Sequence, residues 1–444
     1  MAAKIIVTGK GKIAGVEKKG YTVYKGIRYA KPPIGELRFR APQETDSWEG
    51  VYQADKFSTI CYQMEQQEGS FYTKEFFSDP SYMTPMSEDS LFLNIWVPEH
   101  AQGEALPVAF WIHGGAFFNG YGHEMEFDGE AFCRKGVILV TINYRLGAFG
   151  FLAHPWLTAE SRNGSSGNYG ILDQIAALNW VHEYIPAFGG DPSKITIFGQ
   201  SAGSISAQVL VSSKLTAGKI KGAILQSGGG YNSGLGRDKT LVEAEQLGEE
   251  FAKLCDVKSL EELRALPTEI IMNKAQELFV NSMKLGTEGL PFTPVVDGYV
   301  LTKGYTGIVD AGLHQDIPYM IGSTKNDIGV TEEMLKKGIK SQLYQGCINW
   351  SLKLVEQGRQ PAYVYYFTRQ LKGDEAGAFH SSELWYEFAT LGRSWRPKEE
   401  ADDRLSEDMV TYWTNFVKTG NPNEPGLGEW KPCTKADPFV KEFY

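Results

Sequence analysis

Apolar runs broken by glycine and by polar turns occupy the first half of the chain. Residues 4–29 read as glycine-punctuated strands, and the runs 90–97, 107–112 and 136–144 are rich in the β-branched and aromatic residues that strands favour. The runs carry apolar side chains at nearly every position, which is typical of strands buried on both faces. The pattern therefore predicts several strands of one buried sheet.

Helical spacing separates two of these predicted strands. Residues 173–184 carry apolar side chains at every third or fourth position, and a Gly-Gly-Asp-Pro turn at 189–192 leads into the apolar run 195–198. Another short strand is predicted at 220–226. Strands that alternate with helices predict an α/β fold, with a large, mostly parallel central sheet covered by helices on both faces. We expect a single domain over residues 1–444.

One serine lies between two glycines where the strand ending at Phe198 passes into a helix of small residues. The segment reads Gly199-Gln200-Ser201-Ala202-Gly203, a G-x-S-x-G pattern. The two glycines leave room for a very tight turn, and the turn holds the serine oxygen clear of the sheet. The helix behind the serine adds partial positive charge at the same point. The pattern predicts Ser201 as a nucleophile.

A second glycine pair follows the strand 107–112, in His113-Gly114-Gly115-Ala116-Phe117. Acyl transfer builds negative charge on a carbonyl oxygen, and one backbone N–H aimed at that oxygen is worth about 2.7 to 4 kcal/mol. Glycines let the backbone come that close. Together with the serine turn, this segment predicts an oxyanion hole. The helical, charged region 238–284 is expected to form an excursion over this site.

Composition and charge exclude other classes of function. The net charge of −10 and the absence of basic clusters argue against nucleic acid and membrane as partners. No apolar run reaches the roughly 20 residues that span a bilayer, and the apolar start of the chain is too short for a signal peptide. The five scattered cysteines lack metal or redox spacing and are typical of a reducing compartment. We expect a cytoplasmic protein without cofactor or metal.

In their order along the chain, these segments and three others resemble the type B carboxylesterases. That α/β-hydrolase family includes cholinesterases and bacterial para-nitrobenzyl esterases, and the resemblance covers nearly the whole chain. The further segments are Gly26–Phe39, Glu88–Ile95 and Asn168–Gln174. The resemblance implies a bacterial-type intracellular esterase that cleaves small-molecule esters through an acyl-enzyme. It also implies that the amides of Gly115, Ala116 and Ala202 form the oxyanion hole.

The remaining catalytic residues are expected after the nucleophile, because this fold supplies them in the order serine, acid, histidine. Of the seven histidines, only His314 and His380 follow Ser201. The surroundings of His380, with Glu383 three positions later, resemble the family's histidine loop. We therefore predict His380 as the general base and His314 as a surface residue.

The acid is expected where a predicted strand passes into a loop at residues 319–327. This segment resembles the family segment that ends on the catalytic carboxylate, so Asp327 is predicted as the acid. The family more often has glutamate there, followed directly by glycine, whereas the glycine here is Gly329. Glu332 and Glu333 therefore stay open as alternatives.

Two departures from the family affect the prediction. Ser90 stands where many secreted members have a cysteine, so Cys61 lacks the disulfide partner that the resemblance implies. The stretch between Asp327 and His380 is shorter than in typical members, which predicts a shallow cleft open to bulky or aromatic esters. The irregular, aromatic segment 59–86 fits a pocket mouth and a cover over the core equally well.

Substrate identity is the least determined feature. Aromatic residues near the motifs suit apolar or aromatic groups, and we name four as candidate pocket walls, against the alternative of core packing: Phe117, Phe118, Phe292 and Trp385. We expect broad specificity that includes aryl or hydroxycinnamoyl esters. An amidase or carbamate hydrolase with the same residues is the alternative, and a non-catalytic binding protein is a further one. The sequence does not decide between monomer and dimer.

Overall fold

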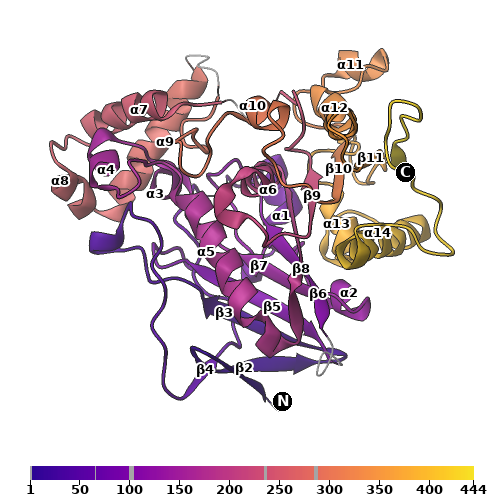
Figure 1. The fold of residues 1–444 in the computed structure, drawn as a ribbon, viewed down its shortest axis with the longest axis horizontal. Coiled ribbons are helices and arrows are strands. Elements are labelled where there is room, and N and C mark those ends of the chain that lie inside the picture. Colours follow the sequence, from indigo (N-terminus) through magenta and orange to yellow (C-terminus); the bar gives the residue numbers. More distant parts are fainter. Residues whose placement is uncertain (1–2, 66, 100–104, 235–237, 285–288) are drawn as a thin grey trace.

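A computed structural model describes residues 3–65, 67–99, 105–234, 238–284 and 289–444 (Figure 1). Within these ranges, one sheet has the strand order β1-β2-β3-β5-β7-β6-β8-β9-β10-β11-β12, and β4 pairs with β2. The strands are β1 (Ala3–Thr8), β2 (Gly11–Lys18), β3 (Tyr21–Arg28), β4 (Val51–Gln53), β5 (Phe92–Pro98), β6 (Leu106–Ile112), β7 (Ile138–Ile142), β8 (Gly190–Gln200), β9 (Gly222–Gln226), β10 (Tyr319–Thr324), β11 (Tyr363–Phe367) and β12 (Lys441–Phe443).

The sheet divides into an antiparallel and a parallel part. Neighbouring strands from β1 to β7 along the sheet are antiparallel, whereas those from β7 to β12 are parallel. Since parallel strands need crossover connections, the second part brings the carboxyl ends of β6, β8 and β10 to one edge. This arrangement confirms the predicted α/β class with its large, mostly parallel sheet.

Helices and short 3₁₀ turns cover both faces of the sheet (Figure 1). Helices α5, α6 and α12 contact strands on one face, and α2 and α14 contact strands on the other. The helices are α1 (Phe71–Phe76), α2 (Glu130–Arg134), α3 (Gly147–Phe151), α4 (Pro155–Glu160), α5 (Tyr169–Tyr184), α6 (Ala202–Ser212), α7 (Leu241–Leu254), α8 (Leu260–Ala265), α9 (Thr268–Lys284), α10 (Tyr305–Asp310), α11 (Glu332–Lys336), α12 (Gln342–Glu356), α13 (Leu384–Glu387) and α14 (Glu400–Thr419). The 3₁₀ turns are η1 (Gly35–Leu37), η2 (Pro80–Tyr82), η3 (Ile185–Phe188), η4 (Lys214–Thr216) and η5 (Leu391–Arg393).

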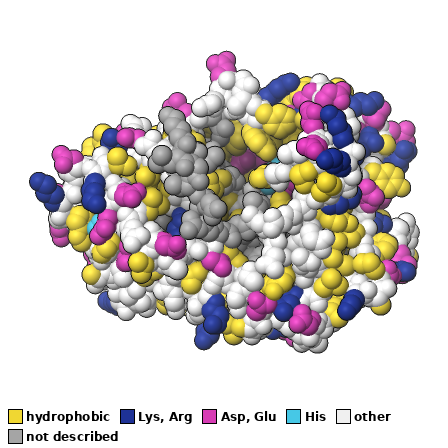
Figure 2. Space-filling model, turned by 90° about the horizontal axis from the view of Figure 1, so that it is seen from above, with side chains coloured by type: hydrophobic (Ala, Val, Ile, Leu, Met, Phe, Trp, Pro, Cys, Tyr) yellow, Lys and Arg dark blue, Asp and Glu magenta, His cyan; other side chains and the backbone are white. Residues whose placement is uncertain are grey.

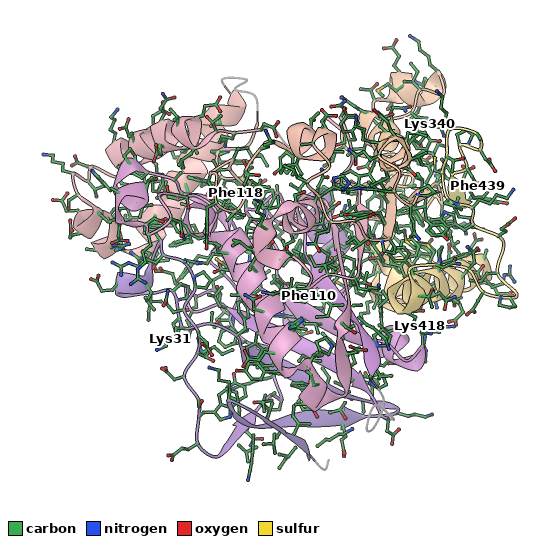
Figure 3. All side chains as sticks on the ribbon, viewed as in Figure 1. Lys31, Phe110, Phe118, Lys340, Lys418 and Phe439 are labelled. Carbon is green, nitrogen blue, oxygen red and sulfur yellow. The ribbon has the colours of Figure 1, made fainter. Side chains whose placement is uncertain are left out.

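Strand β6 shows why its sequence is apolar at nearly every position. Val108 and Phe110 belong to the core cluster on one face, whereas Ala109 and Trp111 belong to the cluster on the other. Figure 3 shows Phe110 near the centre of the molecule, with charged side chains such as Lys31 at its edge. A strand that is covered on both faces buries successive side chains alternately in two cores.

The predicted excursion at 238–284 is helical, as α7, α8 and α9. These helices contact α3, α4 and η1 and lie at the upper left of Figure 1. The ring of Phe279 in α9 reaches toward the site by packing against Phe118, with 4.7 Å between ring centroids. The excursion therefore flanks the edge of the sheet that carries the catalytic motifs.

The predicted turn at 189–192 is shorter than expected. Gly189 ends η3 with φ of 83°, but β8 already begins at Gly190, which pairs with Leu106 of β6. A register irregularity between Leu106 and Val108 lets the pairing extend past the Asp-Pro pair. In the described ranges, no helix is long and apolar enough to cross a membrane.

Candidate active site

Ser201 occupies the turn between β8 and α6 in a strained backbone conformation, with φ of 56° and ψ of −124°. Such a conformation is rare for a residue with a side chain and persists only where its surroundings enforce it. The two flanking glycines explain how the turn closes. A Cβ atom on Gly203 would collide with the Ile112 carbonyl oxygen, and one on Gly199 would collide with the backbone of Gly203. The G-x-S-x-G spacing is therefore a steric requirement of this turn.

The loop after β6 passes directly beside this serine. A Cβ atom on Gly114 would lie 3.2 Å from Ser201 Cβ. Gly115, Ala116 and Phe117 have φ of 94°, 56° and 63°, so the backbone turns through three consecutive left-handed residues. The Gly115 carbonyl accepts the amides of Phe118 and Asn119, both at 2.9 Å, which closes the turn.

Three amides at this junction are open. Within the described residues, the N–H groups of Gly115 and Ala116 donate to no acceptor. The same holds for Ala202, which is the first residue of α6 and so has no acceptor within its helix. These are the three amides predicted for the oxyanion hole. Unpaired N–H groups beside a helix N-terminus favour an anion.

The His113 side chain contacts the backbone of this loop. Its ring is fully buried, stacks on Tyr144 with 4.3 Å between centroids, and places Nδ1 2.9 Å from the Gly114 carbonyl oxygen. Burial lowers the pKa of His113 to about 4. The ring is therefore neutral and acts as a support for the glycine loop.

Asp327 and His380 come together although 53 residues separate them. His380 Nδ1 lies 2.6 Å from Asp327 Oδ1, and Asp327 is buried. The carboxylate also accepts the Ser227 hydroxyl at 2.7 Å and the amides of Thr324 and Ile328 at 3.0 and 2.8 Å. Burial raises the pKa of Asp327, but the nearby His380 and these hydrogen bonds outweigh it and hold the pKa below its usual range.

A short backbone bridge fastens the loops that carry these two residues. Asn326 and Phe379 form an isolated parallel bridge, and the Asn326 amide donates to the Ala378 carbonyl at 2.8 Å. The Asn326 side chain accepts the Ala378 amide at 3.1 Å. Gly377 leaves room for that side chain, since a Cβ there would collide with it. The bridge therefore sets the position of each loop relative to the other.

Ser201, His380 and Gln200 line one cavity, and the Gln200 side chain lies beside the imidazole of His380. Gln200 Nε2 lies 3.1 Å from His380 Nε2, whereas the Ser201 hydroxyl makes no hydrogen bond to any described residue. With Nδ1–H donated to Asp327, Nε2 is the acceptor of the Gln200 amide. Sequence reasoning missed Gln200, although its place directly before the nucleophile was a signal.

Two further buried acids, Glu383 and Glu387, follow His380 along the chain. Burial first, and then the charge of Asp327, raises the pKa of Glu383 to about 7. Glu387 Oε2 accepts the Gln226 side chain at 2.7 Å, and burial followed by the charge of Glu383 raises its pKa well above the usual range. Glu383 was predicted near the histidine, and Glu387 was not.

Comparison with known proteins adds to this geometry. A family model described as "Carboxylesterase family" matches residues 2–349 and 341–443 of the chain. The chain belongs to the carboxylesterase family. Its relatives include the fumonisin B1 esterase of Sphingopyxis macrogoltabida, 32% identical over 95% of this chain and 83% of that protein. The para-nitrobenzyl esterase of Bacillus subtilis is also 32% identical, over 95% of this chain and 91% of its own.

Solved structures agree with the family assignment. A PNB esterase superimposes with a TM-score of 0.86 at 27% identity, covering 100% of this chain and 96% of that one. A carboxylesterase of Geobacillus stearothermophilus superimposes with a TM-score of 0.81 at 31% identity, over 99% and 96% of the two chains. The predicted α/β-hydrolase fold is confirmed. The protein is a carboxylic ester hydrolase, whose substrates are small-molecule esters.

Two cavities of the carboxylesterase meet at Ser201. Ser201, Ala116 and Ile328 line both. One cavity, of about 280 Å³, is lined by His380, and we call it the histidine cavity. Its further lining residues include Tyr72, Phe76, Phe77, Asn119, Glu124, Glu126, Phe127, Gln200, His380 and Leu384. The other, of about 580 Å³, we call the amide cavity, and it is lined by Phe117, Ala202, Ile205, Lys239, Leu290, Thr293, Pro294 and Tyr305, among others.

The predicted aromatic walls are mostly core residues. Phe117 lines the amide cavity, but Phe118, Phe292 and Trp385 are absent from the described lining of both cavities. Phe118 packs on Phe292 at 5.7 Å, and the fully buried Trp385 stacks on Phe76 at 5.5 Å. We therefore leave these three out of the proposed pocket. The rings that do line the histidine cavity come from the irregular segment 59–86, which sequence left undecided, and from Phe127.

Other sequence expectations concern residues away from the reacting atoms. Glu332 and Glu333 are exposed in α11, where they pair with Lys336 and Lys337, and neither contacts His380. The prediction that His314 lies on the surface is wrong. Its ring is 2% exposed and packs against Trp350 at 5.1 Å, because the aromatic core under β10 encloses it.

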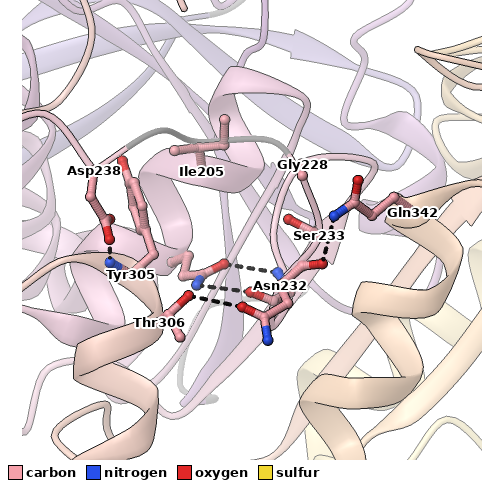
Figure 4. A pocket seen from close by; sticks show the side chains of 11 residues that line it. Ile205, Gly228, Asn232, Ser233, Asp238, Tyr305, Thr306 and Gln342 are labelled. Atoms are coloured by element: carbon pink, nitrogen blue, oxygen red, sulfur yellow. Dashed lines mark hydrogen bonds between the residues drawn. The ribbon is translucent and has the colours of Figure 1, made fainter. Parts of the chain in front are cut away.

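A third cavity, of about 340 Å³, continues the amide cavity, with which it shares Ile205 and Tyr305 (Figure 4). Its polar groups bond mainly to one another. The Thr306 hydroxyl donates to Asn232 Oδ1 at 3.2 Å, and Gln342 donates to the Asn232 carbonyl at 3.4 Å. This cavity therefore extends the space on the amide side without adding a reacting group.

Figure 2 views the carboxylesterase from above and shows a hollow near the centre of this face, with hydrophobic side chains around it. Large apolar side chains exposed near the site include Ile328 at 48% and Tyr72 at 43%. Both line the histidine cavity. Among the described residues, no group of three or more His, Cys, Asp or Glu side chains is placed to hold a metal ion.

Proposed function

We propose that this carboxylesterase cleaves esters by covalent catalysis, with Ser201 as nucleophile, His380 as general base and Asp327 as the carboxylate that orients the histidine. The amides of Gly115, Ala116 and Ala202 stabilise the oxyanion. The observation that carries this proposal is the 2.6 Å hydrogen bond between Asp327 and His380, next to a serine on the same cavity.

The hydrogen bonds support the following path for the proton. Asp327 accepts Nδ1–H, which leaves the lone pair of His380 on Nε2 to take the proton of Ser201 as its oxygen attacks the ester carbonyl. The Gln200 amide now donates to that lone pair, so it has to move aside as the serine approaches. The imidazolium then gives its proton to the leaving alcohol, and water repeats the cycle on the acyl-enzyme.

The position of the base assigns the two cavities. The protonated histidine has to reach the oxygen of the leaving alcohol, and His380 lines only one of the two cavities that meet at Ser201. We therefore place the alcohol in the histidine cavity. The acyl group lies in the amide cavity, where Ala116 and Ala202 face the carbonyl and the larger volume accommodates long chains.

We further propose broad specificity that includes aryl and hydroxycinnamoyl esters. The support is the ring-lined histidine cavity beside a 580 Å³ acyl cavity. The name of the para-nitrobenzyl esterase, at 32% identity, also favours esters of aromatic alcohols. We propose a cytoplasmic location as well, because all five cysteines lie in the described ranges as buried, free thiols.

The first experiment is a series of para-nitrophenyl esters, from acetate to long-chain and aromatic acyl groups. Ser201→Ala should lower kcat by at least about 10⁴-fold, since it removes the nucleophile. Ser204→Ala is the matched control, because that buried serine lies one turn further along α6 with its hydroxyl unpartnered among described groups. Equal activity of wild type and Ser201→Ala would overturn the mechanism.

A further inference from the structure

Two residues that line the histidine cavity each carry a buried side-chain oxygen to which no described protein group donates. These oxygens are Glu126 Oε2 and Asn119 Oδ1. Glu126 is only 1% exposed. A buried acceptor without a donor costs about 1 to 3 kcal/mol, so such a group indicates a missing partner. Asn119 Oδ1 is an acceptor in every state, and Glu126 Oε2 is one when the carboxyl proton lies on the other oxygen, so a partner that brings hydrogen-bond donors suits both.

A second acid lies beside Glu126 and explains its state. Glu124 Oε1 accepts the amide of Tyr121 at 2.8 Å, and its carboxyl group shares a side-chain hydrogen bond with that of Glu126. Burial raises the pKa of Glu124 to about 7, and burial followed by the charge of Glu124 raises the pKa of Glu126 further. At neutral pH the pair therefore keeps a proton in its shared hydrogen bond, which leaves Glu126 Oε2 as an acceptor.

The rest of the cavity is aromatic. Tyr72 and Phe76 belong to α1, Phe77 follows it, and Phe127 follows the acid pair along the chain. Ring faces and edges pack well against another ring, with offset or edge-to-face geometry. A ligand that suits the whole cavity therefore combines an aromatic ring with a hydrogen-bond donor.

We propose that the histidine cavity is a leaving-group subsite for aromatic alcohols that carry a second hydroxyl group, with Glu126 and Asn119 as the acceptors that select that hydroxyl. The subsite rests on the proposed function, because the position of His380 places the alcohol in this cavity. The substrates that it favours are esters of hydroxylated benzylic alcohols and phenols. Glu126 and Asn119 determine specificity and take no part in bond breaking.

A neutral hydroxyl fits this cavity better than an ammonium group. Burying a charged amine requires a charged partner to offset the loss of hydration. Burial raises the pKa of both acids, so the pair shares a proton, and a neutral donor binds without requiring the pair to ionise. A phenolic hydroxyl donates to the carboxyl oxygen in either protonation state, and its ring is buried by the aromatic walls.

The test compares benzyl acetate, 3-hydroxybenzyl acetate and 3-methoxybenzyl acetate, because the three leaving alcohols are close in reactivity. In the wild type, kcat/KM for the hydroxylated ester should exceed both others by about tenfold, the factor expected for a satisfied buried acceptor. The methoxy group fills the same position but cannot donate a hydrogen bond, so this ester separates the effect of hydrogen-bond donation from the effect of substituent size. Adding 3-(aminomethyl)benzyl acetate tests the charged alternative, and a preference for it would overturn the proposal.

Variants test which residues cause the preference for the hydroxylated ester. Glu126→Leu removes the acceptor and should reduce the ratio of kcat/KM between hydroxylated and plain ester to about one, whereas Glu126→Gln keeps a carbonyl oxygen and should retain most of it. Glu130→Leu, at an exposed position of α2, is the matched control and should keep the full ratio. Asn119→Ala should lower the ratio in part. An unchanged ratio in Glu126→Leu overturns the assignment.

The outcomes separate the two proposals. Equal rates on all three benzyl esters that vanish in Ser201→Ala would overturn the subsite and leave the serine mechanism standing. Hydrolysis that persists in Ser201→Ala would overturn the mechanism itself. The wild-type comparison needs no variant, so the subsite stays testable even where a substitution in the buried acid pair prevents folding.

Discussion

The two cavities that meet at Ser201 are built from different chemistry. The histidine cavity holds the base, the acid pair Glu124 and Glu126, and a wall of rings. The amide cavity is larger, lies at the N-terminus of α6 and contains aliphatic side chains around Phe117 and Ala202. The difference teaches that the enzyme separates its tasks. In the proposed mechanism, proton transfer takes place on one side of Ser201, and the carbonyl and its acyl chain are held on the other.

The largest expected effect tests the proton-handling side. Asp327→Asn keeps the size of the side chain but turns an acceptor of Nδ1–H into a donor, which favours the wrong histidine tautomer. We expect kcat on para-nitrophenyl acetate to fall by about 10⁴-fold. Asp297→Asn is the matched control, because that acid accepts the amides of Tyr299, Val300 and Leu301 away from His380.

Retention of more than about a tenth of wild-type activity in Asp327→Asn would contradict the orienting role assigned to this acid. Circular dichroism and thermal unfolding of both variants would show whether a loss comes from the fold. Asp327 is held by four contacts, which include the Ser227 hydroxyl and the amides of Thr324 and Ile328. An asparagine oxygen retains some of these contacts, so the loop should stay in place.

The second prediction tests the carbonyl-holding side. Gly115→Ala adds a methyl group where φ is 94° and where a Cβ collides with the Asn119 carbonyl oxygen, so the oxyanion loop has to shift. We expect kcat to fall by about 10² to 10³-fold for all acyl groups alike, the loss measured when an oxyanion donor is removed. Steady-state kinetics across the ester series measures it.

Gly136→Ala controls for the backbone strain alone. Gly136 also has a left-handed φ, of 74°, but a Cβ there meets nothing within 4 Å. This control should lose stability without losing kcat. A similar loss of kcat in both variants, or no loss in Gly115→Ala, would contradict the proposed role of the glycine loop in stabilising the oxyanion.

Some features of the site were easier to predict from the sequence than others. The serine turn and the glycine loop were predictable because their constraints are local and steric, as the collisions at Gly199 and Gly203 demonstrate. Asp327 and His380 were predictable only through the resemblance, since a bridge between Asn326 and Phe379 brings them together across the sheet edge. The spacing of residues along the chain does not reveal that bridge.

The cavity walls were not predictable for a different reason. An aromatic residue is equally suited to a core and to a pocket, so Trp385 and Phe292 read the same in sequence as Phe76 does. Which of them meets solvent depends on how α1 packs against the histidine loop. The buried acid Glu126 was missed because a glutamate after a glycine-rich loop is usually exposed.

The third prediction concerns pH and arises from the proton-handling side. Burial and then Asp327 raise the pKa of Glu383 from its ordinary value of 4.5 to about 7 in the folded state. The unfolded state therefore loses this proton first as pH rises. The stability that the neutral group contributes is complete below pH 4.5 and falls by about 3 kcal/mol up to pH 7.

Glu383→Gln stays neutral at every pH and should remove this loss. We expect the free energy of unfolding of the variant, relative to wild type, to rise by about 3 kcal/mol between pH 4.5 and pH 7. Urea denaturation at the two pH values measures the difference. Glu333→Gln, in exposed α11, should show no comparable change. A flat difference for Glu383→Gln would mean that the pKa of this acid is the same in the folded and unfolded states.

The smallest expected effect tests the hydrogen bond between Gln200 and His380, beside Ser201. The Gln200 amide donates to His380 Nε2 at 3.1 Å, and so competes with Ser201 for the same lone pair. A neutral hydrogen bond is worth about 0.5 to 1.5 kcal/mol, so Gln200→Ala should raise kcat/KM by about two- to tenfold. Gln315→Ala, whose side chain bonds Thr216 far from the cavities, is the control and should leave kcat/KM unchanged.

A fall in kcat/KM in Gln200→Ala, with an unchanged melting temperature, would give Gln200 the opposite role. The amide would then hold the imidazole in line with the serine instead of competing with it. The acyl series distinguishes the two roles further, because competition for Nε2 acts before the acyl group matters. Release from competition should therefore raise kcat/KM by the same factor for acetate and for long-chain esters, and a chain-length dependence would point to a change in the amide cavity.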